Sequence, residues 1–245
     1  MKKKSEKKSR NNPKTILPIV GLIVLVIALI AAFVFIVIEF TSPKMQEINT
    51  DSEIIGIPMQ RYFYDEEGGC LEYNEILLRN EKLTPEKLST EQKEAVAINF
   101  LIGQSYSGYS YDYINKIYQV FFGTGESIAE KDLYETANGT LQRNEGGAYV
   151  IRKTCAEPEV YTCVALDKAY KSEKNDILKV VVGVFTITSE NGNVYSGLQH
   201  DGDTLGIRDE FKIDDKLGEL PKWELTFKID RSSGLYQLAS TEKIS

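Results

Sequence analysis

Apolar and polar positions divide this chain into one long uninterrupted apolar run and a following series of shorter periodic segments. The run covers residues 16–38, a stretch of 23 residues without a charge. At about 1.5 Å per residue, a helix of this length measures about 34 Å, slightly more than the hydrocarbon core of a bilayer. The pattern therefore predicts a transmembrane helix within residues 15–40.

A cleaved signal peptide is the alternative interpretation, because it also places an apolar run after basic residues. Its apolar region is shorter and ends in small residues, whereas Phe33, Phe35 and Phe40 crowd the end of this run. We therefore expect an uncleaved anchor. Seven lysines and arginines but one glutamate precede it, which predicts that residues 1–14 form a cytosolic basic tail and that the rest lies outside.

Helical patterns come first after the run. Thr84-Pro85 resembles a helix start, and the apolar spacing that follows predicts a helix ending at Gly103. A second helix is expected over residues 110–122, where Gly123 supplies the stop. The spacing Ser127-x-x-Glu130 is typical of a capping box and predicts a third, shorter helix that ends near Asn138-Gly139.

From Ala148 onward, the pattern changes to alternation and to β-branched residues, which favours strands. The expected strands cover residues 148–154, 160–170, 177–188, 194–199, 223–230 and 236–243. Residues 177–187 are apolar on both faces, so this strand should be central and covered by helices. Asn191-Gly192 and the segment 231–234 are expected to be hairpin turns. Together these elements predict an α+β domain with helices packed on a curved antiparallel sheet.

Charge and composition set further limits. Residues 15–245 hold 22 basic and 35 acidic residues, a net charge of about −13, so the exported part should be repelled by nucleic acid. Neither a repeat nor a low-complexity linker divides it. The predicted organisation is a tail (1–14), the transmembrane helix (15–40), a juxtamembrane segment (41–83) and one extracytoplasmic domain (84–245).

This order of helices followed by an antiparallel meander resembles the NTF2-like (cystatin-like) domains of single-pass bacterial membrane proteins. The resemblance covers about residues 84–243 and rests on pattern alone, and the segment 197–220 departs from the minimal fold. The layout of tail, span and domain is also similar to inner-membrane scaffold subunits of type IV secretion and conjugation machines.

Candidate chemistry is sparse. The single histidine, His200, and three cysteines are too few for a zinc site or a serine-type triad, and the acidic residues between 201 and 215 lack the spacing of a calcium loop. We therefore expect neither metal nor cofactor, and no catalytic activity. A cluster of aromatic residues could line a ligand surface or form a packing seam. Its members are Tyr109, Tyr113, Tyr118 and Phe121.

Cys155 and Cys163 flank a predicted hairpin turn near Glu159. If the strands pair about that centre, the two side chains oppose one another at a distance that suits a disulfide. Reduced thiols are the alternative, and Cys70 could compete for either partner.

The sequence thus favours a non-catalytic scaffold or binding module, anchored in the plasma membrane by a single pass and possessing a domain outside the bacterial cell. Its expected partners are the lipid bilayer and other envelope proteins or a second copy. The alternative is a carrier or sensor of a small apolar or aromatic ligand, bound in a pocket between helices and sheet.

Overall fold

The computed structural model describes residues 27–31, 33, 44–64, 74–78, 81–104, 108–136, 139–153, 160–174, 176–198, 203–231 and 233–245. The chain divides into two compact units, residues 1–44 and 45–245. In the first unit, residues 27–31 and 33 are helical and exposed. Most of the predicted span lies outside the described residues. Within the residues that are described, no helix is both long and apolar enough to cross a membrane.

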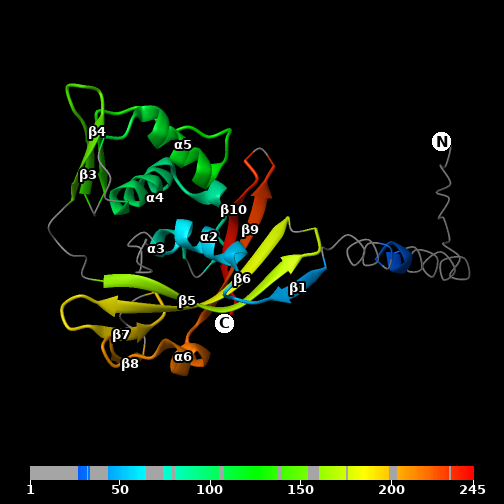
Figure 1. Ribbon diagram of the computed structural model, residues 1–245. Coiled ribbons are helices and arrows are strands. Elements are labelled where there is room, and N and C mark those ends of the chain that lie inside the picture. Colours follow the sequence, from blue (N-terminus) through cyan, green and yellow to red (C-terminus); the bar gives the residue numbers. More distant parts are fainter. Residues whose placement is uncertain are drawn as a thin grey trace, which may run out of the picture. The chain divides into compact units, whose positions relative to one another are not determined.

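The second unit is an α+β domain in which helices pack against a large antiparallel sheet (Figure 1). The large sheet holds β1 (Met45–Ile48), β5 (Val160–Ser172), β6 (Ile177–Thr188), β7 (Asn193–Ser196), β8 (Thr204–Ile207), β9 (Lys222–Asp230) and β10 (Leu235–Lys243). A small sheet holds β2 (Leu133–Thr136), β3 (Gly139–Arg143) and β4 (Tyr149–Lys153). The helices are α2 (Glu53–Tyr62), α3 (Asn74–Leu77), α4 (Thr90–Gly103), α5 (Tyr111–Phe122) and α6 (Ile213–Lys216), with 3-10 turns η1 (Pro85–Lys87) and η2 (Leu217–Glu219).

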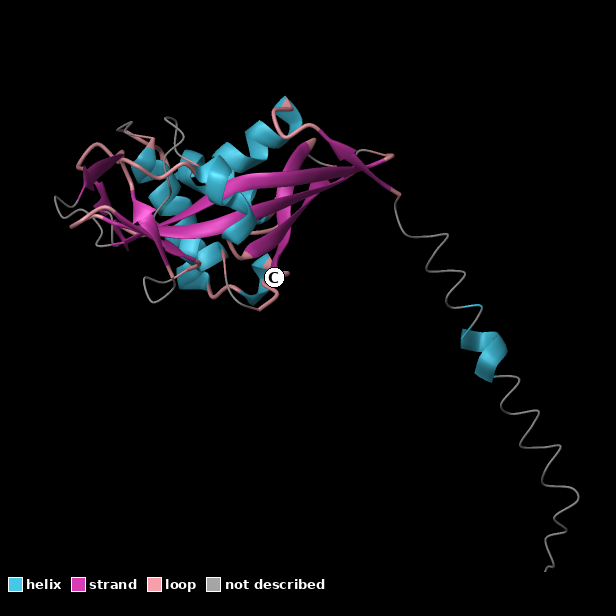
Figure 2. Ribbon diagram, turned by 90° about the horizontal axis from the view of Figure 1, so that it is seen from below, coloured by secondary structure: helices cyan, strands magenta, loops and turns pink. Residues whose placement is uncertain are grey.

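Strand β6 is the centre of the large sheet, as its two-faced apolar pattern predicts. It pairs with β5 on one edge, and its other edge is shared by β9 and then β7. Figure 2 shows these long strands running side by side. The predicted hairpins also form, because Asn191-Gly192 joins β6 to β7, and β9 pairs antiparallel with β10 from Asp230 and Leu235 onward. In the latter pair, Trp223, Leu225 and Phe227 are buried on one face, as their alternation indicates.

The main core lies between one face of the large sheet and the helices α2, α3 and α4. Figure 1 shows α2 and α3 between the sheet and α4. Ile55, Met59 and Tyr62 of α2 are at most 1% exposed and pack against the apolar face of β6 and β9. Segment 41–83 was expected to be a juxtamembrane approach, but from Met45 onward it is part of the fold. The domain therefore begins 39 residues before the predicted boundary at 84.

The first predicted helix is interrupted. Pro85 opens η1, but Leu88 has an extended backbone and places its side chain in the main core. Helix α4 begins after Ser89, which is its N-cap. The Ser89 side chain accepts a hydrogen bond from the amide of Gln92, and the Gln92 side chain accepts one from the amide of Ser89, which completes a capping box. The end at Gly103 is confirmed, and α5 has the expected bounds, with Ser110 as N-cap and Gly123 at its end.

The third predicted helix is wrong, because this segment instead forms an irregular stretch and then β2. Side chains of α5 satisfy its backbone in place of helical hydrogen bonds: Asn115 accepts from the amide of Ile128, and Tyr111 donates to the carbonyl of Ile128. Glu130 pairs with Arg143 at 3.0 Å. Tyr134 of β2 is buried in a second core, between the small sheet and α4 and α5. The sheet expected from residue 148 onward is thus two sheets.

Gly183 marks the point at which β6 changes partner from β9 to β7. A Cβ at this position would lie 2.8 Å from Leu220 Cδ1 and 3.0 Å from Leu220 Cβ. We therefore expect Gly183→Ala to destabilise the domain by about 1–3 kcal/mol through overpacking. Gly218→Ala is the matched control, since nothing lies within 4 Å of its Cβ. Urea unfolding of both variants is the measurement, and equal midpoints would contradict the steric role of Gly183.

Candidate functional site

The four predicted aromatic residues lie along α5 and just before it, and they divide between two cores. Tyr109 and Tyr118 pack in the core at the small sheet, whereas Phe121 packs in the main core. These three are buried: Tyr109 is 4% exposed, Tyr118 is 2% exposed and Phe121 is 1% exposed. The hydroxyl of Tyr109 donates to the carbonyl of Leu101 at 3.1 Å. These rings therefore fill the space between α4, α5 and the sheets, as the packing alternative for the cluster requires.

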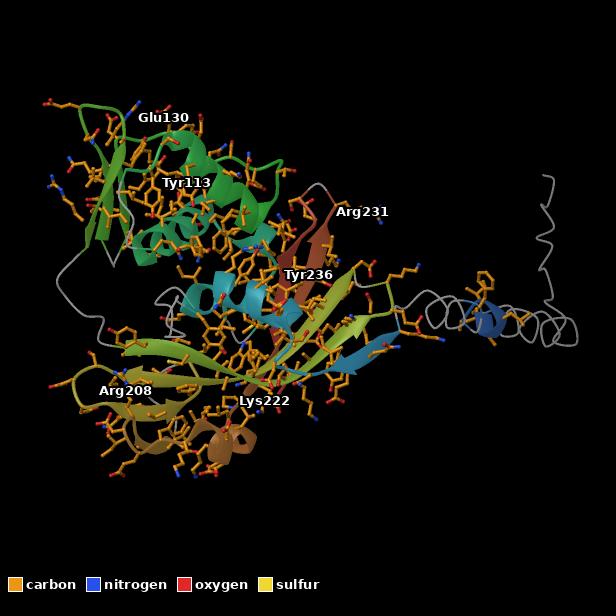
Figure 3. The ribbon with its side chains drawn as sticks, in the orientation of Figure 1. Tyr113, Glu130, Arg208, Lys222, Arg231 and Tyr236 are labelled. Carbon is orange, nitrogen blue, oxygen red and sulfur yellow. The ribbon has the colours of Figure 1, made fainter. Side chains whose placement is uncertain are left out.

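Tyr113 differs from the other members because 46% of it is exposed. Its ring stacks on that of Tyr109 with a centroid distance of 5.4 Å and an interplanar angle of 3°. One face of the ring is thereby covered. Figure 3 labels Tyr113, which lies in the part of the domain formed by α5 and the small sheet.

An apolar pocket lies where α2, α5 and β10 meet. It is lined by Tyr62, Leu77, Leu83, Pro85, Leu88, Phe121, Phe122, Leu238 and Thr241. The free space between these side chains is about 10 Å³, scarcely enough for one water molecule. The protein's own side chains therefore almost fill this site.

The polar groups of the pocket are bound within the protein. Tyr62 donates its hydroxyl proton to the carbonyl of Phe121 and accepts from the amide of Leu238, both at 3.2 Å. Thr241 donates to the carbonyl of Leu77 at 2.6 Å. Burial raises the pKa of Tyr62 to about 12, against the smaller lowering effects of the Leu238 amide and Arg61. The Tyr62 hydroxyl therefore stays protonated at neutral pH and acts as a structural bridge.

Two ion pairs join strands of the large sheet. The Lys222 ammonium forms an ion pair with the Asp167 carboxylate, with an Nζ–Oδ2 distance of 3.1 Å, and it also donates a hydrogen bond to the carbonyl of Leu217. Lys179 bonds Glu224 at 2.7 Å. In the part of the chain that the structure describes, no three His, Cys, Asp or Glu side chains gather as a group that could hold a metal ion. His200 and Asp201 lie outside the described residues.

The geometric argument for the Cys155–Cys163 disulfide does not hold. It requires β4 and β5 to pair as a hairpin, but Lys153 of β4 pairs with Gly139 in the small sheet, and Ala165 of β5 pairs with Gly183 in the large sheet. Cys163 itself is buried and disulfide-bonded. Cys155 and Cys70 both lie outside the described residues, so the pairing of Cys155 with Cys163 stays a prediction.

Sequence reasoning named Phe121 but missed the other residues that line the pocket. Tyr62 and Leu77 belong to the segment assigned to the membrane approach. Gly56 and Pro58, both unfavourable in helices, obscure α2 in the sequence. A hydrophobic spacing of Ile55, Met59 and Tyr62 was the signal available.

The fold thus defines an α+β protein in which helices pack against a large antiparallel sheet. Comparison with protein-family models, curated proteins and solved structures gives no match.

Proposed function

We propose that this chain is a single-pass plasma-membrane protein of the bacterial envelope, with a cytoplasmic N-terminus and an extracytoplasmic domain that serves as a non-catalytic scaffold or binding module. Its partners would be the lipid bilayer together with other envelope proteins or a second copy of the chain.

The observation that carries the proposal is the apolar run of residues 16–38 behind a basic tail. Only six residues separate its end from Met45, where the compact domain begins. A run of this composition partitions favourably into a bilayer, and the excess of preceding lysine and arginine favours retention of the tail in the cytoplasm. The acidic, well-packed domain suits an aqueous compartment.

The NTF2-like likeness is part of the proposal. Its support is the order of elements, because α4 and α5 precede the sheet formed by β5, β6, β9 and β10. The small sheet between α5 and β5 is a further departure from the minimal pattern, beside the segment 197–220. The carrier alternative is less well supported, because the pocket has about 10 Å³ of free space.

A protease-accessibility experiment tests the proposal. We expect protease added outside intact cells, or spheroplasts where an outer membrane is present, to degrade the domain while an epitope within residues 1–14 stays protected. The epitope should become accessible only after detergent is added. A soluble form shortened by about 40 residues, as expected for signal-peptide removal, would overturn the anchor. Protection of the domain would overturn the orientation.

A further inference from the structure

A segment between β8 and β9 covers part of the second face of the large sheet. This segment, residues 209–219, contains α6 and η2, and we call it the strap. Figure 1 shows α6 on the side of the sheet opposite to α2 and α3. Three side chains of the strap pack against a small apolar cluster that includes Phe185 of β6, namely Phe211, Ile213 and Leu217. The strap therefore covers apolar surface that the helices of the main core do not reach.

Packing holds the strap less firmly than it holds the helices of the main core. None of the strap's residues is buried, and its three apolar side chains are only partly covered. The ring of Phe211 lies on that of Phe185 with a centroid distance of 5.4 Å. On the other face of the sheet, by contrast, Ile55, Met59 and Tyr62 of α2 are at most 1% exposed. Because segments with little buried apolar surface open at a lower free energy than the core, the strap should open more easily than α2.

Among the residues that the structure describes, one hydrogen bond joins the strap to the strands of the large sheet that lie beneath it. Its donor is the ammonium of Lys222, at the start of β9, and its acceptor is the carbonyl of Leu217. The backbone hydrogen bonds of the strap itself stay within residues 207–219. Loss of the Lys222 bond would therefore leave only the partly covered apolar side chains to hold the strap between its two ends.

Two features of the sheet hold the Lys222 ammonium at the strap. The register of β5 against β6 shifts at Asp167, which is an extra residue on β5. Such a bulge re-aims the side chain of its strand, and the Asp167 carboxylate lies 3.1 Å from the Lys222 ammonium. Gly183 of β6 is the strand partner of Lys222, and a Cβ at this glycine would lie 3.2 Å from Leu217 Cδ1. The bulge thus supplies the counter-charge, and the glycine leaves room for the strap.

We propose that the strap opens from the large sheet as one unit while the rest of the domain stays folded, and that Lys222 is the latch that keeps it closed. The strap remains attached at both ends, by β8 on one side and by the buried Leu220 on the other. Opening exposes the ring of Phe185, which is 8% exposed when the strap is closed. This motion requires neither the anchor nor the scaffold role of the proposed function, so it is tested independently of both.

Hydrogen exchange of the folded full chain in dilute urea, measured by mass spectrometry at single-residue resolution, tests the opening. The reporters are the amides of Glu210, Phe211 and Asp215, whose hydrogen bonds stay within residues 207–215. We expect them to exchange faster than the amides of β6, with one common urea dependence that is less steep than that of β6. Exchange that urea does not change would show fraying without opening. Exchange as slow and as steep as that of β6 would show that the strap opens only when the domain unfolds, and either result would overturn the proposal.

Lys222→Met tests the latch, and Lys179→Met is the matched control. Each change removes an ammonium group that pairs with a carboxylate on another strand of the same sheet, but Lys179 pairs with Glu224 and does not bond the strap. We expect Lys222→Met to raise the exchange rate of the strap reporters by about tenfold, because a hydrogen bond from a charged donor is lost. Lys179→Met should leave that rate unchanged. No increase in Lys222→Met, or equal increases in the two variants, would overturn the role of Lys222 as the latch.

Discussion

A fragment of residues 84–245 should fail to fold cooperatively, whereas residues 45–245 should fold. The shorter fragment lacks β1, which is the edge strand beside β5, and it lacks α2 and α3, which pack on one face of the sheet. It loses five side chains that are at most 1% exposed, namely Ile55, Met59, Tyr62, Phe63 and Leu78. At about 1.5–3 kcal/mol for each buried side chain, this loss is as large as the stability of a typical domain.

Circular dichroism and urea unfolding of the two fragments are the measurements. Residues 45–245 should give a single sharp transition, and residues 84–245 a broad one or none, with greater binding of a hydrophobic dye. A sharp transition of the shorter fragment would show that β1 and α2 are not required for the domain to fold and do not belong to its core.

The second large effect is expected at Tyr62, which joins three elements. Its ring packs on Phe121 of α5 at 4.9 Å and on Phe227 of β9 at 5.7 Å, and its hydroxyl binds the backbone of Phe121 and of Leu238 in β10. We expect Tyr62→Ala to lower the free energy of unfolding by about 3–5 kcal/mol through the cavity that it leaves.

Two companion variants separate packing from hydrogen bonding at this position. Tyr62→Phe keeps the ring but removes the partner of a buried amide, so a loss of about 1–3 kcal/mol is expected. Tyr113→Ala removes an exposed ring and should cost less than about 1 kcal/mol. Urea unfolding at neutral pH provides all three values. A Tyr62→Ala value no larger than that of Tyr113→Ala would contradict the bridging role.

The success of the sequence predictions follows from local chemistry. The bounds of strand β6 agree with the predicted range 177–188, because few structures other than a buried strand suit a segment that is apolar on both faces. The same pattern indicates its central place in the sheet. Helix α5 was equally clear because a Ser110 cap and a Gly123 stop bracket an apolar stripe. In each case the signal and the element that it predicts lie within the same few residues.

Failures occurred where distant residues decide the local structure. Gly56 and Pro58 disfavour a helix, yet α2 forms because burial of Ile55 and Met59 on the sheet outweighs that cost. The capping-box spacing at Ser127 was misleading because the side chains of Tyr111 and Asn115, more than ten residues earlier, bind the backbone of this segment. The local sequence pattern identifies neither the sheet that buries α2 nor the α5 side chains that bind the segment at Ser127.

The sequence by itself determined the apolar run, the sign of the charge on each side of it, the bounds of the long strands and the two hairpin turns. All of these depend on contiguous residues. Only the tertiary structure decided that Met45 opens the domain, that β4 and β5 belong to different sheets and that the aromatic residues around α5 are mostly buried. These features depend on which surfaces meet, and because many pairings bury similar apolar area, local periodicity cannot choose between them.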